Sequence, residues 1–304
     1  MERTSVVAVA GGTGFVGGAI ARELAMRGRK VIVLSHRKTS ADSIAAIDYR
    51  PADVTRPVSL VTALVGVDTL VISLGFRNSP VEAPRRGQTF EEVDAAGTEA
   101  LVRAAVQAGV HRLVYMSGAG AAPDAERHWF RAKWRAEEAV RGSGIVYTIF
   151  RPSWVYGPGD KSLNRFLGFA RWLPFIPQIG NGRQLLVPVL VSDVAALVAD
   201  ALETPAADNV TFEVGGPESL TMDEIVRAAL LASGRRRPIL HAPAALMKLA
   251  TRPLTLLPTP PMTPDAVDFV VASAPVDTDL LRERLPRRLM PLAEGLATYL
   301  SPRH

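Results

Sequence analysis

The chain has 304 residues, of which 48% are hydrophobic and 21% charged, proportions that exclude a disordered chain and a membrane bundle. Its net charge of +5 favours anionic ligands, but the scattered basic residues and an aromatic content of 6% argue against nucleic acid. The absence of cysteine excludes disulfides and thiolate chemistry, and five histidines without ligand spacing lead us to expect no metal.

The first stretch of the chain is uncharged from Thr4 to Ala21, which superficially resembles a signal peptide or a membrane span. Five glycines interrupt it, at positions 11, 12, 14, 17 and 18. A phosphate-binding loop needs glycines with this spacing, and an apolar signal core does not. We therefore interpret the stretch as a loop and expect a cytoplasmic protein, with a peripheral location at the inner face of a membrane as the alternative.

The next pattern is a strand, a turn and a helix. Ser5–Ala10 is a short apolar run, and a helical pattern follows through Ile20 and Leu24 to a stop at Gly28. Further buried strands are predicted at Val31–Leu34, Val67–Leu74, Arg112–Met116 and Val146–Phe150. Because continuous apolar strands alternate with helical stretches, we predict an α/β fold with a doubly wound parallel sheet, the Rossmann arrangement.

Prolines and glycines become frequent after Pro152, so the chain is expected to leave the sheet there. We expect Ser192 to cap a helix that ends near Leu202, and Val210–Val214 to return as the last sheet strand. The prediction is a dinucleotide-binding domain over residues 1–155, completed by about 188–214.

The remaining residues, 156–187 and 215–304, are predicted to form a smaller α/β domain for a substrate or a partner. Within it we expect helices near Ala244–Ala250 and around Leu292–Leu300. The prolines from 253 to 264 predict a rigid, largely extended segment between these helices.

The glycine loop follows a strand and precedes a helix, and its residues Gly12 to Gly17 satisfy the pattern G-x-G-x-x-G. A turn without Cβ atoms lets backbone N–H groups at a helix N-terminus approach a pyrophosphate. The alternative is a glycine-rich turn that binds nothing. We predict that the loop binds a dinucleotide through Gly11, Gly12, Thr13, Gly14, Phe15 and Val16.

The residues at the end of the second strand indicate which dinucleotide the chain binds. An NAD-binding protein usually places an acid there for the ribose hydroxyls, whereas this chain has Ser35, His36 and Arg37, and no acid before Asp42. A hydroxyl followed by basic side chains suits a 2′-phosphate. We therefore favour NADP over NAD, the alternative being that Arg37 is an ordinary solvated arginine.

Several motifs together resemble the extended short-chain dehydrogenase/reductases. They are the glycine loop, Asp53-Val54, Asp94-x-x-Gly97-Thr98, Val114-Tyr115-Met116-Ser117, Arg151-Pro152-Ser153-Trp154-Val155-Tyr156-Gly157-Pro158-Gly159-Asp160, Pro188-Val189-x-Val191-x-Asp193-Val194 and Gly295-Leu296-x-x-Tyr299-Leu300. More narrowly, the chain is similar to the atypical branch that includes the nucleotide-binding accessory subunit of respiratory complex I and its bacterial stand-alone relatives.

The resemblance implies further cofactor contacts. Asp53 and Val54 would lie at the adenine, Leu74 and Gly75 beside the cofactor after their strand, and Pro152 with Val155 near the nicotinamide. Asp53 could instead cap a turn with Thr55, and Pro152 could simply end a strand.

The family's chemistry uses a tyrosine four residues before a lysine, on one face of a helix. Lys133 is present here and would hold the ribose, but Trp129 occupies the tyrosine position and cannot give up a proton near neutral pH. Ser117 could polarise the substrate, although many members place that hydroxyl where this chain has Ala119. His128 could replace the tyrosine only if the helix turned or shifted.

These observations leave three hypotheses for function, and an enzymatic role stays open. The first is an NADPH-binding atypical protein of this family with an impaired active site, serving in binding, sensing or as a scaffold. The second is an NADPH-dependent reductase of an unidentified carbonyl or quinone. The third is an accessory subunit docked on a membrane complex.

The segment from 238 to 262 suggests a partner surface, because it is rich in leucine and contains only two charged residues, Lys248 and Arg252. We predict that it faces a protein or a membrane. The alternative is that these leucines cover the small domain's own core or line a substrate cleft.

Overall fold

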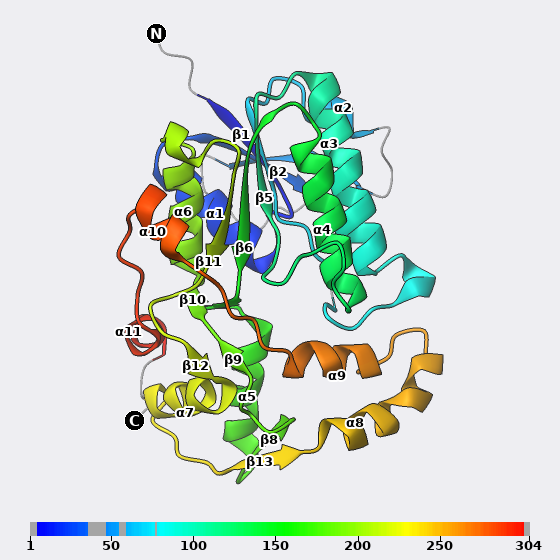
Figure 1. Cartoon of the computed structure of the whole chain (residues 1–304), viewed down its shortest axis with the longest axis vertical. Coiled ribbons are helices and arrows are strands. Elements are labelled where there is room, and N and C mark those ends of the chain that lie inside the picture. Colours follow the sequence, from blue (N-terminus) through cyan, green and yellow to red (C-terminus); the bar gives the residue numbers. More distant parts are fainter. Residues whose placement is uncertain (1–4, 36–46, 55–58, 77, 301–304) are drawn as a thin grey trace.

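The computed structural model describes residues 5–35, 47–54, 59–76 and 78–300, and its centre is a seven-stranded parallel sheet (Figure 1). The strand order is β11-β6-β5-β4-β1-β2-β3. The strands are β1 (Val6–Ala10), β2 (Lys30–Ser35), β3 (Ile47–Pro51), β4 (Thr69–Ile72), β5 (Arg112–Met116), β6 (Val146–Pro152) and β11 (Val210–Val214).

Helices cover both faces of this sheet, which makes three layers (Figure 1). One face carries α1 (Phe15–Met26), α6 (Val191–Ala201) and α10 (Asp279–Arg284). The other carries α2 (Leu60–Ala63), α3 (Gly97–Ala108) and α4 (His128–Arg141). Successive strand residues point to opposite faces, so Val7 and Val9 pack under α1 and α6 while Ala8 and Ala10 pack under the other three helices.

A further core lies beyond the carboxyl ends of the sheet strands. It joins α5 (Lys161–Trp172), α7 (Met222–Ala232) and α11 (Leu292–Ala297) through buried leucines, isoleucine and methionine. Three small sheets accompany it: β7 (Trp154–Tyr156) with β10 (Pro188–Leu190), β8 (Ile176–Ile179) with β13 (Ile239–Ala242), and β9 (Leu185–Leu186) with β12 (Leu220–Thr221). The division into two domains stays a prediction.

The doubly wound parallel sheet predicted from the sequence is confirmed, with different strand limits. The strand predicted over Val67–Leu74 is shorter, because only the four buried residues of β4 pair with neighbours. The edge strand β3 was not predicted: its sequence IDYRP is half exposed and therefore lacks a continuous apolar run.

Three expectations for the second half differ from the structure in their details. The N-cap of α6 is Leu190 and not Ser192, and it makes no side-chain capping bond. The proline segment is not extended throughout, because it contains the 3₁₀ helix η5 (Arg252–Leu256) directly after α8 (Ala244–Thr251) and ends in α9 (Pro264–Val271). The last helix, α11, stops at Ala297. Among the described residues, no helix has the length and apolar character to cross a bilayer.

Candidate functional site

The carboxyl edge of the sheet contains the point where the strand order reverses. β1 pairs with β2 on one side and with β4 on the other, and the glycine loop follows β1 directly. In doubly wound folds, ligands bind in the crevice at this position. The register aligns Ala10 with Leu34 and with Ile72, so the residues after these strands meet at one edge.

The loop itself has the shape that a pyrophosphate needs. Gly14 is the N-cap of α1, and its N–H donates to the Gly11 carbonyl at 2.8 Å, which closes the turn. Gly11 has φ +82°, and a Cβ there would lie 2.1 Å from the Ser73 carbonyl oxygen. Thr13 and Gly14 are exposed, so the N-terminus of α1 is open to an anionic ligand.

Gly11→Ala is therefore expected to lower the affinity for NADPH at least about tenfold, because a left-handed alanine costs about 1–2 kcal/mol and its Cβ must push the loop out of place. Calorimetric titration measures the affinity. Gly168→Ala is the matched control: Gly168 lies in α5, where a Cβ would have open space around it, and the change should leave binding unchanged. Equal affinities of Gly11→Ala and the native chain would contradict the role of the loop.

The structure brings other predicted cofactor residues to the same edge. Ser35 ends β2 and is buried, and Pro152 ends β6 beside Val214. A Cβ on Gly97 would lie 3.1 Å from Val54 and 3.3 Å from Leu74, so these two side chains converge on the start of α3.

The remaining residues predicted to contact the cofactor differ in their exposure and position. Asp53 is half buried, Gly75 is exposed, and Val155 lies in β7 opposite Val189. His36, Arg37 and Thr55 lie outside the described residues. The cofactor roles of all these residues stay predictions.

Helix α4 turns Trp129, Lys133 and Glu137 inward, because residues four apart share one helix face. Trp129 is 3% exposed and packs against Phe90 and against Phe269 of α9, with ring centroids 6.3 and 5.4 Å away. Its Nε1 has no hydrogen-bond partner in the described part of the chain. The residue at the position where the family has its tyrosine is therefore buried in an aromatic cluster.

Lys133 forms a buried ion pair with Asp94, which belongs to the π-helical segment η3 (Phe90–Ala96). Lys133 Nζ lies 2.6 Å from Asp94 Oδ1 and 5.6 Å from the centre of the Tyr115 ring. Burial opposes the charge on the lysine, but the Asp94 carboxylate raises the pKa of Lys133 above its usual value. The lysine ammonium is directed at Asp94.

Ser117 is held in a second buried network. Its hydroxyl donates to Glu137 Oε1 at 2.6 Å, and Glu137 is fully buried. Arg151 binds both oxygens of Glu137, at 2.8 and 2.6 Å, and this bonding raises the Arg151 pKa above its usual value. Ala119, the alternative position for the polarising hydroxyl, is buried and donates its N–H to the Pro152 carbonyl.

His128 lies at the outer edge of the aromatic cluster. Its ring is 5.2 Å from that of Trp129, and its Nε2 is 2.9 Å from Glu82 Oε2. Glu82 also accepts a bond from the N–H of Phe90. This histidine is hydrogen-bonded to a carboxylate beside the site.

Three contributors to the site were missed in the sequence: Asp94 and Glu137 as partners of Lys133 and Ser117, and Phe269 as a cover for Trp129. The i, i+4, i+8 spacing of 129, 133 and 137 was a usable signal. Helix α9 was marked by Thr263-Pro264-Asp265: the Thr263 hydroxyl accepts from the N–H of Ala266, and proline occupies the first turn.

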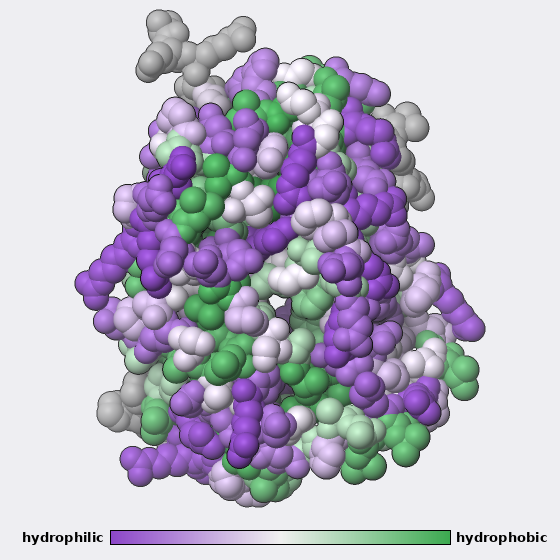
Figure 2. Space-filling model, in the orientation of Figure 1, coloured by the Kyte–Doolittle hydropathy of each residue, from purple (hydrophilic) through white to green (hydrophobic). Residues whose placement is uncertain are grey.

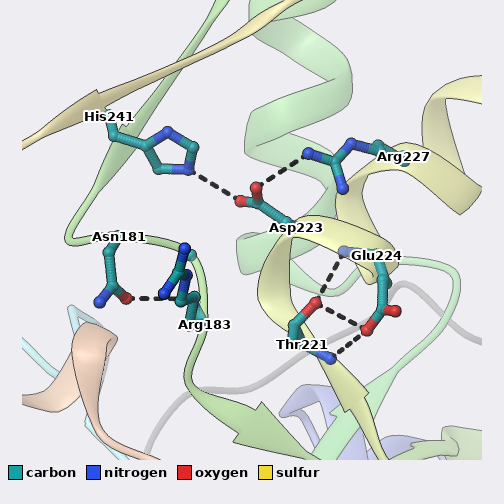
Figure 3. A pocket seen from close by; sticks show the side chains of 8 residues that line it. Asn181, Arg183, Thr221, Asp223, Glu224, Arg227 and His241 are labelled. Carbon is teal, nitrogen blue, oxygen red and sulfur yellow. Dashed lines mark hydrogen bonds and ion pairs between the residues drawn. The ribbon is translucent and has the colours of Figure 1, made fainter.

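A separate pocket of about 590 Å³ lies in the second half of the chain (Figure 3). Asp223, at the start of α7, stands between His241 and Arg227, at 2.9 and 3.0 Å. Asn181 and Arg183 come from the loop after β8. The opposed charges of these side chains largely compensate one another. Neither in this pocket nor in the rest of the described ranges are three His, Asp or Glu side chains grouped to hold a metal.

The comparison with protein families agrees with this geometry. The NAD(P)H-binding family matches residues 11–173, which include the glycine loop, all of α4 and the end of β6. The chain belongs to this NAD(P)H-binding family.

Its relatives include both subunits and reductases. The chain is 31% identical over 232 residues to NADH dehydrogenase (ubiquinone) 1 alpha subcomplex subunit 9 of Arabidopsis thaliana mitochondria, covering 72% of this chain and 56% of that subunit. The chain thus spans little more than half the length of this relative. It is 26% identical to the NAD(P)H azoreductase of Xenophilus azovorans, over 90% of this chain and 88% of that enzyme.

Solved structures share the fold at low identity. MoeE5 in complex with UDP-glucuronic acid and NAD superposes with a TM-score of 0.75 and 22% identity, over 97% of this chain and 98% of MoeE5. This likeness shows a shared fold, and the subunit relative confirms the resemblance to the branch that includes the complex I accessory subunit.

Proposed function

We propose that this protein binds NADPH in preference to NADH, and that its tyrosine-dependent active site is impaired, so that it acts in binding, sensing or as a scaffold. One observation carries the proposal of an impaired active site: Trp129 is buried at the tyrosine position while Lys133 is paired with Asp94. Neither side chain offers a proton near neutral pH. The similarity to a complex I subunit supports the scaffold role.

The residues present fit a dinucleotide. The loop after β1 excludes a Cβ at Gly11 and opens the N-terminus of α1, where backbone N–H groups would hold the pyrophosphate. A bound nicotinamide would supply a hydride. Pro152 and Val155 would position its ring, and Lys133 would hold its ribose only by sharing its charge with Asp94.

The preference for NADPH is expected to be about ten- to a hundredfold, the effect of one charge-assisted hydrogen bond to the 2′-phosphate. We assign this bond to Arg37, with help from Ser35 and His36. Calorimetric titration of both cofactors measures it. Arg37→Ala should weaken the binding of NADPH and leave that of NADH unchanged. Arg103→Ala, which removes an exposed arginine of α3, should change neither affinity. Equal affinities for the two cofactors would refute the assignment.

The impaired active site is tested by NADPH oxidation with a panel of small carbonyls and quinones. We expect no turnover above the Gly11→Ala background, or only a slow one. A native rate in the ordinary enzymatic range of about 1–10³ s⁻¹ would overturn the proposal.

A second candidate, an NADPH-dependent reductase, is favoured by the His128–Glu82 pair beside Trp129. In this case His128 delivers the proton that accompanies the hydride, and Glu82 orients its ring. His128→Gln would then abolish the turnover without changing NADPH affinity. Loss of binding instead of turnover would exclude this role of His128.

A further inference from the structure

The apolar surface predicted for residues 238–262 is exposed. Leu246 and Leu249 on α8 are 59% and 61% exposed, and Leu256 at the end of η5 is 77% exposed. Leu240 and Leu257 extend the same chain segment and are half exposed. We call these five leucines the basal leucines; Figure 2 shows apolar residues gathered at the lower right, where Figure 1 places α8.

Helix α8 is oriented opposite to an ordinary surface helix. Its one buried residue is Thr251, whose hydroxyl donates to the Met247 carbonyl. Lys248 faces inward to α9, with its Nζ 2.9 Å from Asp268. The polar residues thus anchor the helix, and the leucines face outward. An exposed apolar group of this kind marks a binding surface.

The two chain segments that contain the basal leucines and Trp172 carry bases and no acids, although Asp268 of α9 and Asp223 of α7 pair with some of these bases. Residues 161–192 and 225–264 contain ten of the chain's 35 lysines and arginines and none of its 30 acids, so the rest of the chain has five more acids than bases. The two segments lie side by side because β8 pairs with β13. Among the described residues, the exposed Arg171, Arg236 and Arg252 form no ion pair.

An exposed tryptophan lies near the residues that precede β13. Trp172 ends α5 and is 86% exposed, the largest exposure of any large hydrophobic side chain in the described ranges. Its neighbour Leu173 accepts a bond from Arg237, which connects it to the strand that leads to α8. Tryptophan is typical of the level of lipid headgroups, where one part of the ring is apolar and another is wet.

We propose that the basal leucines, Trp172 and the surrounding arginines dock this protein on the surface of a membrane that contains anionic lipids. Leucines enter the boundary between headgroups and acyl chains, and the unpaired arginines attract phosphate groups. The docking is peripheral and needs no membrane-spanning helix.

Vesicle flotation tests this surface, with phosphatidylcholine vesicles compared with vesicles that also contain phosphatidylglycerol. The protein should float only with the anionic vesicles, and raising the salt from 0.01 to 1 M, which shortens the screening length from about 30 to about 3 Å, should release it. Leu246→Asp with Leu249→Asp should lower the partition coefficient at least about tenfold. Arg236→Ala and Arg252→Ala should lower it about fivefold each.

Met26→Asp is the matched control, since Met26 is 74% exposed on α1 outside this surface. It should float like the native protein, and every variant should keep its NADPH affinity as proof of folding. The proposal is overturned if the protein does not bind anionic vesicles or if neutral vesicles bind it equally well. It is also overturned if the variant Leu246→Asp with Leu249→Asp floats like the native protein. A native dimer that the leucine pair converts to a monomer, without any flotation, would assign the surface to a second copy instead.

Discussion

Trp129→Tyr is expected to create or raise NADPH-dependent carbonyl reduction by about 10²–10⁴-fold, the usual contribution of a general acid. The new phenol would lie one helical turn before Lys133 on the same face of α4. The positive charge of Lys133, maintained by Asp94 2.6 Å away, would favour the phenolate and so ease proton transfer. Steady-state NADPH oxidation with small aldehydes and ketones measures the effect.

Trp129→Phe is the matched control for this substitution. It removes the same part of the indole from its contacts with Phe90 and Phe269 but adds no hydroxyl. Any gain that Trp129→Phe shares with Trp129→Tyr would come from opening the aromatic cluster. If neither variant changes an already ordinary rate, another group supplies the proton, and our interpretation of the site is wrong.

Lys133→Met is expected to lower the free energy of unfolding by about 3–5 kcal/mol at neutral pH, because it leaves the Asp94 carboxylate buried without its partner. Methionine keeps the length and apolar part of the lysine side chain. Urea unfolding measures the loss. Lys248→Met is the matched control: it breaks an ion pair whose lysine is 40% exposed, and it should cost less than about 1 kcal/mol.

The effect of Lys133→Met has a definite pH dependence. Burial raises the pKa of Asp94, and the variant loses the charge of Lys133 that opposes this shift. The folded variant then binds a proton that the unfolded chain releases above about pH 4, so its stability falls as pH rises from there through the raised pKa. The loss should be smaller at about pH 5 than at about pH 8. The double variant Lys133→Met with Asp94→Asn should remove this dependence, and an unchanged dependence would contradict the assignment to Asp94.

Local patterns were sufficient for much of the fold. The strands β1, β5 and β11 were predicted because each is a short apolar run between turn signals. The glycine loop was recognised because its glycines, strand and helix are adjacent in the chain. β3 was not predicted, because an edge strand is buried on one side only and therefore shows no continuous apolar run.

The candidate site was predicted less completely, since its groups meet through contacts between distant segments. Lys133 and Ser117 were identified in the sequence by their positions. Their partners were not, because Asp94 lies 39 residues before the lysine and Glu137 lies 20 residues after the serine. Phe269 reaches Trp129 from a helix that follows 140 residues later in the chain.

The sequence by itself determined the class of fold and the position of the glycine loop, because each depends on residue types at short spacing. The resemblance added the prediction that Trp129 stands where the family has its tyrosine. Only the tertiary structure decided that Lys133 is paired with Asp94, that Ser117 is held by Glu137, and that the leucines of α8 face outward. Those outcomes depend on which elements pack together. Burial then sets the cost of every unpaired charge, and a charge in the interior must be directed at its partner.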